Sequence, residues 1–164
     1  MAATYEKIAT TTLGSAAATI DFTSISSAYT DLVVIINATL SGAGGTVYCR
    51  INGDTGSNYS VTGILGTGTT VGNSRLTNNT NGVAVGGFNG YDTSQFNAIL
   101  HFMNYSNTTT QKTVLGRWNQ TSSVEANVSL WRSTSAINQL TIRNNNSNNF
   151  NSGSTVTLYG IKAA

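Results

Sequence analysis

Few residues of this chain could take part in chemistry. Its 164 residues include one histidine, His101, and one cysteine, Cys49. A histidine that acts as a catalytic base needs a nucleophile and an orienting carboxylate beside it. Cys49 belongs to a different predicted strand, and no Gly-x-Ser-x-Gly motif is present. We therefore expect His101 to be a hydrogen-bonded or interfacial side chain rather than a catalytic one.

The acidic residues show no catalytic pairing in the sequence. Glycosidases use two carboxyl groups that flank the scissile bond. The six acids are Glu6, Asp21, Asp31, Asp54, Asp92 and Glu125. We expect each of them at a chain end or in a loop, and we assign no catalytic residue. A glycan-cleaving enzyme stays as a third hypothesis, which would need two carboxylates about 5–10 Å apart in a cleft.

Two loops resemble ligand-binding motifs. The run Gly66–Gly72 is glycine-rich like a phosphate-binding loop, but it lacks a following helix and a Lys-Ser or Lys-Thr pair. The run Asn52–Asn58 places oxygen ligands at alternate positions, as calcium loops do, with Asp54 as its one carboxylate. We expect surface turns at both places, with Asp54 bonded to nearby backbone amides. A weak cation site at Asn52–Asn58 stays open, and no metal or cofactor is otherwise expected.

Composition excludes several classes of function. Charged residues make up 9% of the chain, against about 25% in an ordinary domain, and Ser, Thr and Asn make up about two-fifths. The net charge is +2 without clustered cations, so we expect no nucleic-acid binding. The longest apolar run, Leu32–Ile36, is far shorter than the roughly 20 residues that span a bilayer. The N-terminal residues 1–7 lack the basic and apolar regions of a signal peptide, so we expect a soluble protein that is made in a cytoplasm.

The hydrophobic pattern has a period of two throughout, which predicts an all-β protein. The alternation between residues 126 and 132 separates Val128 and Leu130 from Asn127, Ser129 and Trp131. With many short strands and no linker, the sequence predicts a sandwich or barrel in one domain over residues 1–164. The predicted strands are Glu6–Leu13, Thr19–Ile25, Asp31–Leu40, Thr46–Asn52, Tyr59–Leu65, Arg75–Asn78, Val83–Phe88, Gln95–Asn104, Lys112–Trp118, Ala126–Arg132, Gln139–Arg143 and Thr155–Ile161.

Two patterns point to contacts with other molecules. The run Leu32–Ile36 is apolar at every position, which predicts a central strand covered on its second face by a loop or a partner subunit. Trp118, Trp131, Tyr91 and Tyr105 suit a sugar-binding groove or a subunit contact, and the sequence does not separate these two uses.

Several segments resemble a family of virion structural proteins of tailed bacteriophages, common among phages of aquatic bacteria and cyanobacteria. The similarity runs nearly from end to end, and its most specific blocks are Asn-Gly-Asp…Ser-Asn-Tyr and Trp-Arg-Ser…Ala-Ile. The segments are Tyr5–Ala9, Leu13–Ser15, Ile51–Ser60, Met103–Thr109, Leu130–Thr134, Ala136–Asn138 and Gly153–Lys162.

The resemblance implies a jelly-roll-like antiparallel β-sandwich that decorates the capsid, often as a trimer, or forms part of a tail fibre. It implies no catalytic residues. We therefore expect a non-enzymatic capsid decoration, or cement, protein on the capsid surface of the virion, synthesised in the host cytoplasm. Its partners would be copies of itself and the major capsid protein, across whose subunit junctions it would bind to stabilise the phage head.

The expected contact residues combine an N-terminal arm with aromatic side chains. The arm covers about residues 1–8, and the candidate interface residues are Tyr5, Ile8, Tyr105, Trp118 and Trp131. The alternative is a tail-fibre or tail-associated β-sandwich domain that binds a host surface glycan. Its site would lie around Tyr91 or the polar loop Asn144–Asn149.

Overall fold

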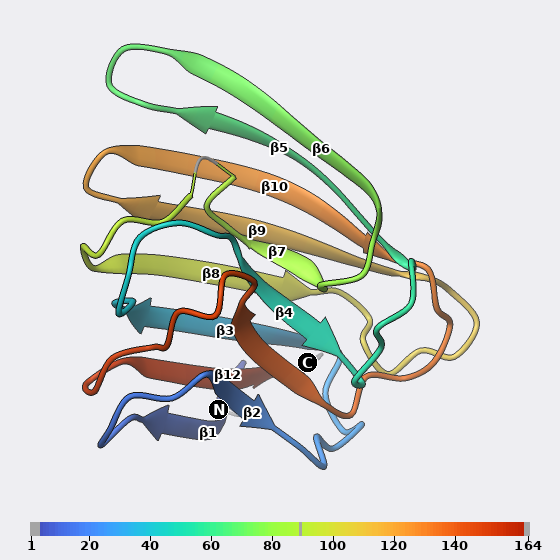
Figure 1. Ribbon diagram of the computed structural model, residues 1–164. Coiled ribbons are helices and arrows are strands. Elements are labelled where there is room, and N and C mark those ends of the chain that lie inside the picture. The colour runs from blue at the N-terminus through green and yellow to red at the C-terminus, as the bar shows by residue number, and fades with distance from the viewer. Residues whose placement is uncertain (1–3, 89, 163–164) are drawn as a thin grey trace.

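The computed structural model describes residues 4–88 and 90–162. Over these residues the chain forms twelve β-strands in two antiparallel sheets that face each other (Figure 1). The described residues include no helix long and apolar enough to cross a membrane. The predicted all-β sandwich is confirmed.

The two sheets differ in width. The large sheet has eight strands, in the order β1 (Tyr5–Thr12), β12 (Thr155–Ile161), β3 (Asp31–Ala38), β8 (Phe96–Phe102), β9 (Lys112–Gln120), β10 (Ser123–Trp131), β5 (Tyr59–Gly66) and β6 (Val71–Asn79). The small sheet has four strands, in the order β2 (Thr19–Phe22), β11 (Leu140–Asn144), β4 (Val47–Ile51) and β7 (Val83–Gly86).

The strand order is that of a jelly roll with two added hairpins. The pairs β1–β12, β2–β11, β3–β8 and β4–β7 are nested inside one another along the chain, and each pair is antiparallel. Such nesting is what results when one long hairpin wraps into two facing sheets, as in eight-stranded jelly rolls. The hairpins β5–β6 and β9–β10 lie between members of these pairs and extend the large sheet beyond β8.

All twelve predicted strands exist, with ends that differ by a few residues. The largest difference is β6, which begins at Val71 rather than Arg75 because β5 and β6 form a hairpin with only Thr67–Thr70 at its tip. The expected N-terminal arm is corrected in part: residues 1–3 lie outside the described residues, but Tyr5–Ile8 belong to β1, which pairs with β12.

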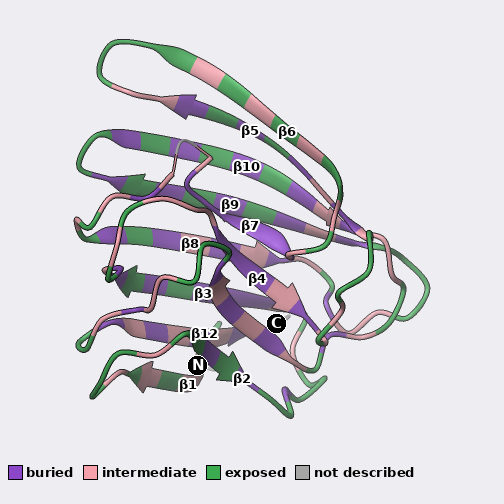
Figure 2. Cartoon of the chain, in the orientation of Figure 1, coloured by how far each residue is buried: buried purple, intermediate pink, exposed green. Residues whose placement is uncertain are grey.

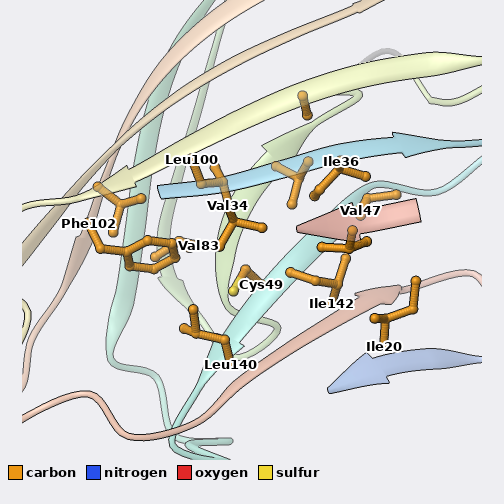
Figure 3. Close-up of a cluster of buried hydrophobic side chains, with 14 of the residues drawn as sticks. Ile20, Val34, Ile36, Val47, Cys49, Val83, Leu100, Phe102, Leu140 and Ile142 are labelled. Carbon is orange, nitrogen blue, oxygen red and sulfur yellow. The ribbon is translucent and has the colours of Figure 1, made fainter. Parts of the chain in front are cut away.

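The core fills the space between the sheets. Along β3, Leu32, Val34 and Ile36 point toward the small sheet and are fully buried. Figure 3 shows Val34 and Ile36 close to aliphatic residues of the small sheet, with the Cys49 side chain among them. Each such aliphatic side chain contributes about 1.5–3 kcal/mol when fully buried. Burial also raises the pKa of the Cys49 thiol, so this free cysteine is an inert core residue.

The Asn52-Gly53 turn has the predicted conformation. Both residues have the expected positive φ, 50° and 68°, but the turn leads from β4 in the small sheet to β5 in the large sheet and is not a hairpin. The Asn52 side chain donates a hydrogen bond to the carbonyl of Ala136 (2.8 Å) and accepts one from the amide of Asn138 (2.9 Å). The turn therefore also joins the β4 end of the small sheet to the segment before β11.

Glycine is required at Gly160 because the ring of Tyr29 lies against its Cα, where a Cβ would overlap the ring. We expect Gly160→Ala to destabilise the fold by about 1–3 kcal/mol, the usual range for overpacking a core. Gly14→Ala is the matched control, since a Cβ there has no neighbour within 4 Å. Urea denaturation of both variants tests this, and equal stabilities would contradict the packing.

Candidate functional site: the outer face of the large sheet

Exposed apolar side chains gather on one surface of the molecule. We call the side of the large sheet that points away from the small sheet the outer face. It carries every large hydrophobic side chain that is exposed among the described residues, with exposed fractions from 40% at Ile35 to 87% at Val71. These residues are Tyr5, Ile35, Ile64, Val71, Leu115, Val124 and Val128. The exposed bands along the large sheet appear in Figure 2.

The strand register places these side chains in continuous rows. One row crosses six strands and contains Ile35, Ile99, Arg117, Ala126, Ile64 and Asn73. The next row contains Val33, His101, Leu115, Val128, Thr62 and Arg75. Residues opposite each other on neighbouring strands are in contact range. In these two rows the outer face is therefore an aliphatic surface that is interrupted by Arg117, His101, Thr62, Asn73 and Arg75.

The strand β10 is amphipathic, but its polar side chains point into the molecule and its apolar side chains point out. Its polar residues Ser123, Glu125, Asn127 and Ser129 point inward and are buried, whereas Val124, Ala126 and Val128 point outward and are exposed. The predicted alternation is confirmed. The set that contains Trp131 is the buried one, even though it also contains the polar residues. An apolar outward face and a polar inward face are expected where the outward face contacts something else.

The buried polar residues of β10 are accommodated by specific contacts. Asn127 lies between Gly116 and Gly63 on the neighbouring strands, and a Cβ on Gly116 would overlap its amide group. The carboxylate of Glu125 accepts hydrogen bonds from the backbone amides of Gly87 (3.1 Å) and Phe88 (3.3 Å) and from the Asn127 side chain (3.3 Å). Burial raises the pKa of Glu125, and these three donors offset only part of that rise.

His101 lies on the outer face and is paired with Asp31. Its Nε2 is 2.8 Å from Asp31 Oδ2, and Asp31 Oδ1 accepts a hydrogen bond from the amide of Asn104 (2.7 Å). The pair joins the start of β3 to the turn after β8. This confirms the expected hydrogen-bonded histidine, and its neighbours in the row are Val33 and Leu115, which offer no nucleophile.

Three adjoining hollows follow the outer face along β5, β10 and β9. The first, of about 590 Å³, lies between the tips of the β5–β6 and β9–β10 hairpins, at Thr67–Thr70 and Thr121–Ser123. The second, of about 390 Å³, shares Gly66 and Val71 with it. The third, of about 580 Å³, lies around Ala126 and extends to His101. Together they form a shallow groove that is polar at the hairpin tips and more apolar around Ala126, and a partner surface could fill it.

The five expected interface residues do not act as a group. Tyr5 is exposed on β1, and Ile8 is half-buried beside it. The expectation is wrong for Tyr105, Trp118 and Trp131, which are almost completely buried and leave no surface for a partner. The physical reason is that large rings fill the interior of a wide sandwich better than aliphatic side chains do.

Each buried aromatic residue has an internal role. The indole Nε1 of Trp131 donates a hydrogen bond to Asp54 Oδ2 (2.7 Å), and the hydroxyl of Tyr105 donates one to the carbonyl of Ser26. Trp118 packs edge-on against Tyr91, with the ring centroids 5.0 Å apart. Tyr91 is itself buried, so it does not supply the exposed aromatic surface expected around it.

The loop Asn52–Asn58 is a structural turn. The carboxylate of Asp54 accepts hydrogen bonds from the amide of Gly56 (2.8 Å), the side chain of Asn58 (2.9 Å) and Trp131. Burial raises the pKa of Asp54, but these donors outweigh it and hold the pKa below the usual value. Both oxygens thus face N–H donors, and no cluster of three metal-ligating residues occurs among the described residues.

The remaining acids also have structural partners. The expectation of loop or terminal positions is wrong for Asp21 and Glu125, which lie within strands, and for Asp31, which begins β3. Strand positions suit them because each carboxylate accepts hydrogen bonds locally. The donors are Lys162 for Glu6, Thr19 and Thr141 for Asp21, and Ser94 for Asp92.

Comparison with known proteins adds little. No protein-family model matches the chain, and no curated protein matches it. Among solved structures, a variant of the alginate lyase Aly36B in complex with an alginate tetrasaccharide is similar over 94% of this chain and 79% of that chain. The sequence identity is 8% and the TM-score 0.31, which is too low to support an argument about this chain.

The contacts of Glu125 predict a pH dependence of stability. A carboxyl group whose pKa is raised on folding favours the folded state when protonated, and this contribution is lost as the pH rises through the folded pKa. The unfolding free energy of the wild type, minus that of Glu125→Gln, should therefore decrease as the pH rises from below the ordinary value of 4.5. Urea titrations between pH 4 and 8 measure it, and parallel curves would contradict the assignment.

Proposed function

We propose that this chain is a non-enzymatic structural protein of a tailed-bacteriophage virion that decorates the capsid and stabilises the head across junctions between major capsid subunits. The observation that supports this best is the outer face: a contiguous apolar surface of this kind on a soluble protein is typical of an assembly contact. The resemblance of the segments around Ile51–Ser60 and Leu130–Thr134 to virion proteins supplies the virion context.

The way the fold is held together suits such a role. The described residues contain two ion pairs, His101–Asp31 and Lys162–Glu6. Neutral hydrogen bonds do similar work at the edge of the large sheet, where Thr10 bonds to Thr157 (3.1 Å) between β1 and β12. Apolar contacts and neutral hydrogen bonds are screened by salt far less than ion pairs. A particle coat built this way would tolerate both fresh and salt water.

The glycan-binding alternative loses one of the two sites that were expected for it. Tyr91 is buried, whereas the loop after β11 keeps Asn145, Asn146 and Ser147 exposed while it is bonded to the loop before β4. There the Asn145 side chain accepts a hydrogen bond from the amide of Thr46 (2.7 Å), and the Asn148 side chain donates one to the carbonyl of Ala43 (3.1 Å). No observation therefore favours a sugar site over an assembly surface.

Stability should depend weakly on salt. Two exposed ion pairs contribute at most about 1 kcal/mol each, and a change of 1 kcal/mol moves Tm by about 2–4 °C in a chain of this size. We expect Tm to fall by no more than about 4–8 °C between 50 mM and 1 M KCl, the limit set by complete loss of both pairs. Calorimetry measures this, and a fall several times larger would show that ion pairs dominate.

The location of the protein in the particle tests the function. Particles of the parent phage are separated into heads and tails, and both fractions are probed by mass spectrometry and antibody labelling. We expect the protein on heads, in many copies. Heads stripped of it should break at a lower temperature and recover when purified protein is added back. Recovery in the tail fraction alone would overturn the proposal.

A further inference from the structure

In the middle of the outer face, similar residues lie at equal distances on the two sides of a central line between two strands. The six strands β3, β8, β9, β10, β5 and β6 have the seam between β9 and β10 at their centre. In the first row, Arg117 and Ala126 flank the seam, and Ile99 and Ile64 lie one strand further out. Each side of the seam therefore offers an isoleucine at the same distance and a long side chain opposite a small one.

A rotation about this seam produces matching contacts. Two copies placed face to face, with the axis along the strands, bring β9 over β10 and β8 over β5. Ile99 of one copy then meets Ile64 of the other, and Leu115 meets Val128. Arg117 meets Ala126, around which the 580 Å³ hollow lies. We propose that the outer face is covered by the same face of a second copy of this chain, related by a twofold axis along the seam between β9 and β10.

One pair of opposite charges supports the same arrangement, whereas Arg117 meets no acid across the seam. Asp31 is the one acid on the outer face of these six strands, at the start of β3. Arg75 lies on β6, which is as far from the seam on the other side, and its side chain has no hydrogen bond or ion pair within the described part of the chain. The rotation places Arg75 over Val33 of the other copy, one outward position from Asp31. Asp31 already contacts His101 and Asn104, so Arg75 of the other copy would join this cluster, and two symmetric Arg75–Asp31 contacts would form in each dimer.

The surface is large enough for such a dimer. Six strands spaced about 4.8 Å apart and about seven residues long cover roughly 30 Å by 23 Å. That area is close to the roughly 800 Å² per partner that stable interfaces bury. Facing sheets in sandwiches also align within about 30° of each other, so an axis along the strands is a usual packing geometry.

Other occupants fit less well. The outward side chains of β8, β9, β10 and β5 include no Phe, Tyr or Trp, which a sugar-binding surface would be expected to offer. An acidic protein partner would satisfy Arg75 and Arg117, but it would leave Asp31 beside further negative charge. The proposal goes beyond the virion role and does not depend on it, and it replaces the trimer that the resemblance implies by a pair.

The oligomeric state is the first test. Light scattering after size exclusion should give twice 17.1 kDa. The variant Val128→Lys should be monomeric, because it places a charge against Leu115 of the other copy. Its fold should survive, since Val128 is 51% exposed in the single chain. Thr23→Lys is the control, because it adds the same charge at an exposed position after β2, and it should remain dimeric. Circular dichroism verifies that both variants are folded.

The second test fixes the geometry. Ala126→Cys should be joined into a covalent dimer by a short bis-maleimide, whereas Thr23→Cys should not, and the native Cys49 is buried and does not react. Arg75→Glu should raise the dimer dissociation constant at least tenfold, about 1.4 kcal/mol. Arg75→Lys, which keeps the charge, should change it less than threefold.

Each other outcome overturns the proposal. A wild-type monomer at about 200 µM would show that the face does not bind itself. A trimer would exclude a twofold contact, and a dimer that survives Val128→Lys would use another face. A wild-type monomer that binds an acidic protein through this face would identify a different occupant. These results are separate from the particle experiment, since a monomer found on heads rejects the dimer and keeps the virion role.

Discussion

The eight-stranded sheet faces a sheet of only four strands, and the rest of the structure depends on how this difference in width is resolved. The strand β7 and the segment after it cover the inner side of the added hairpins, where β7 packs against β9, β10 and β5. The carboxylate of Glu125 holds that segment by accepting hydrogen bonds from the backbone amides of Gly87 and Phe88. Tyr91 can then pack on Trp118 and close the interior.

The outer face follows from the same constraint. A narrow cover leaves room on the inner side of β10 for polar residues that need partners, and Asn127 and Glu125 take those places. The alternation of the strand then forces Val124, Ala126 and Val128 outward. The apolar surface is thus a consequence of how β10 is anchored from inside, and it persists whether or not a partner is bound.

The strands could be predicted because a period of two and the Gly and Asn turns between them are local signals. Sheet order could not, because it depends on pairings such as that of Thr12 with Thr155, which no local pattern contains. For a related reason, the sequence did not decide which of the two sets of residues in β10 is buried. Its sequence separates the two sets of residues, but the deciding contacts come from Gly87, Gly63 and Gly116 on other strands. The interface aromatics were misplaced because aromatic residues suit cores and surfaces equally well.

The nested pairing has a consequence for how the protein is made. The strand β1 has one neighbour in the sheet, β12, so its hydrogen-bonding partner is synthesised 143 residues or more after it. Folds dominated by such distant pairings form slowly, and exposed strand edges invite aggregation in the meantime. The second half of β1 is rich in Thr and has no large apolar side chain from Thr10 to Thr12, which lowers the tendency of its unpaired edge to aggregate with other chains. This edge of the large sheet can therefore close only after β12 has been synthesised, which is later than the other eleven strands.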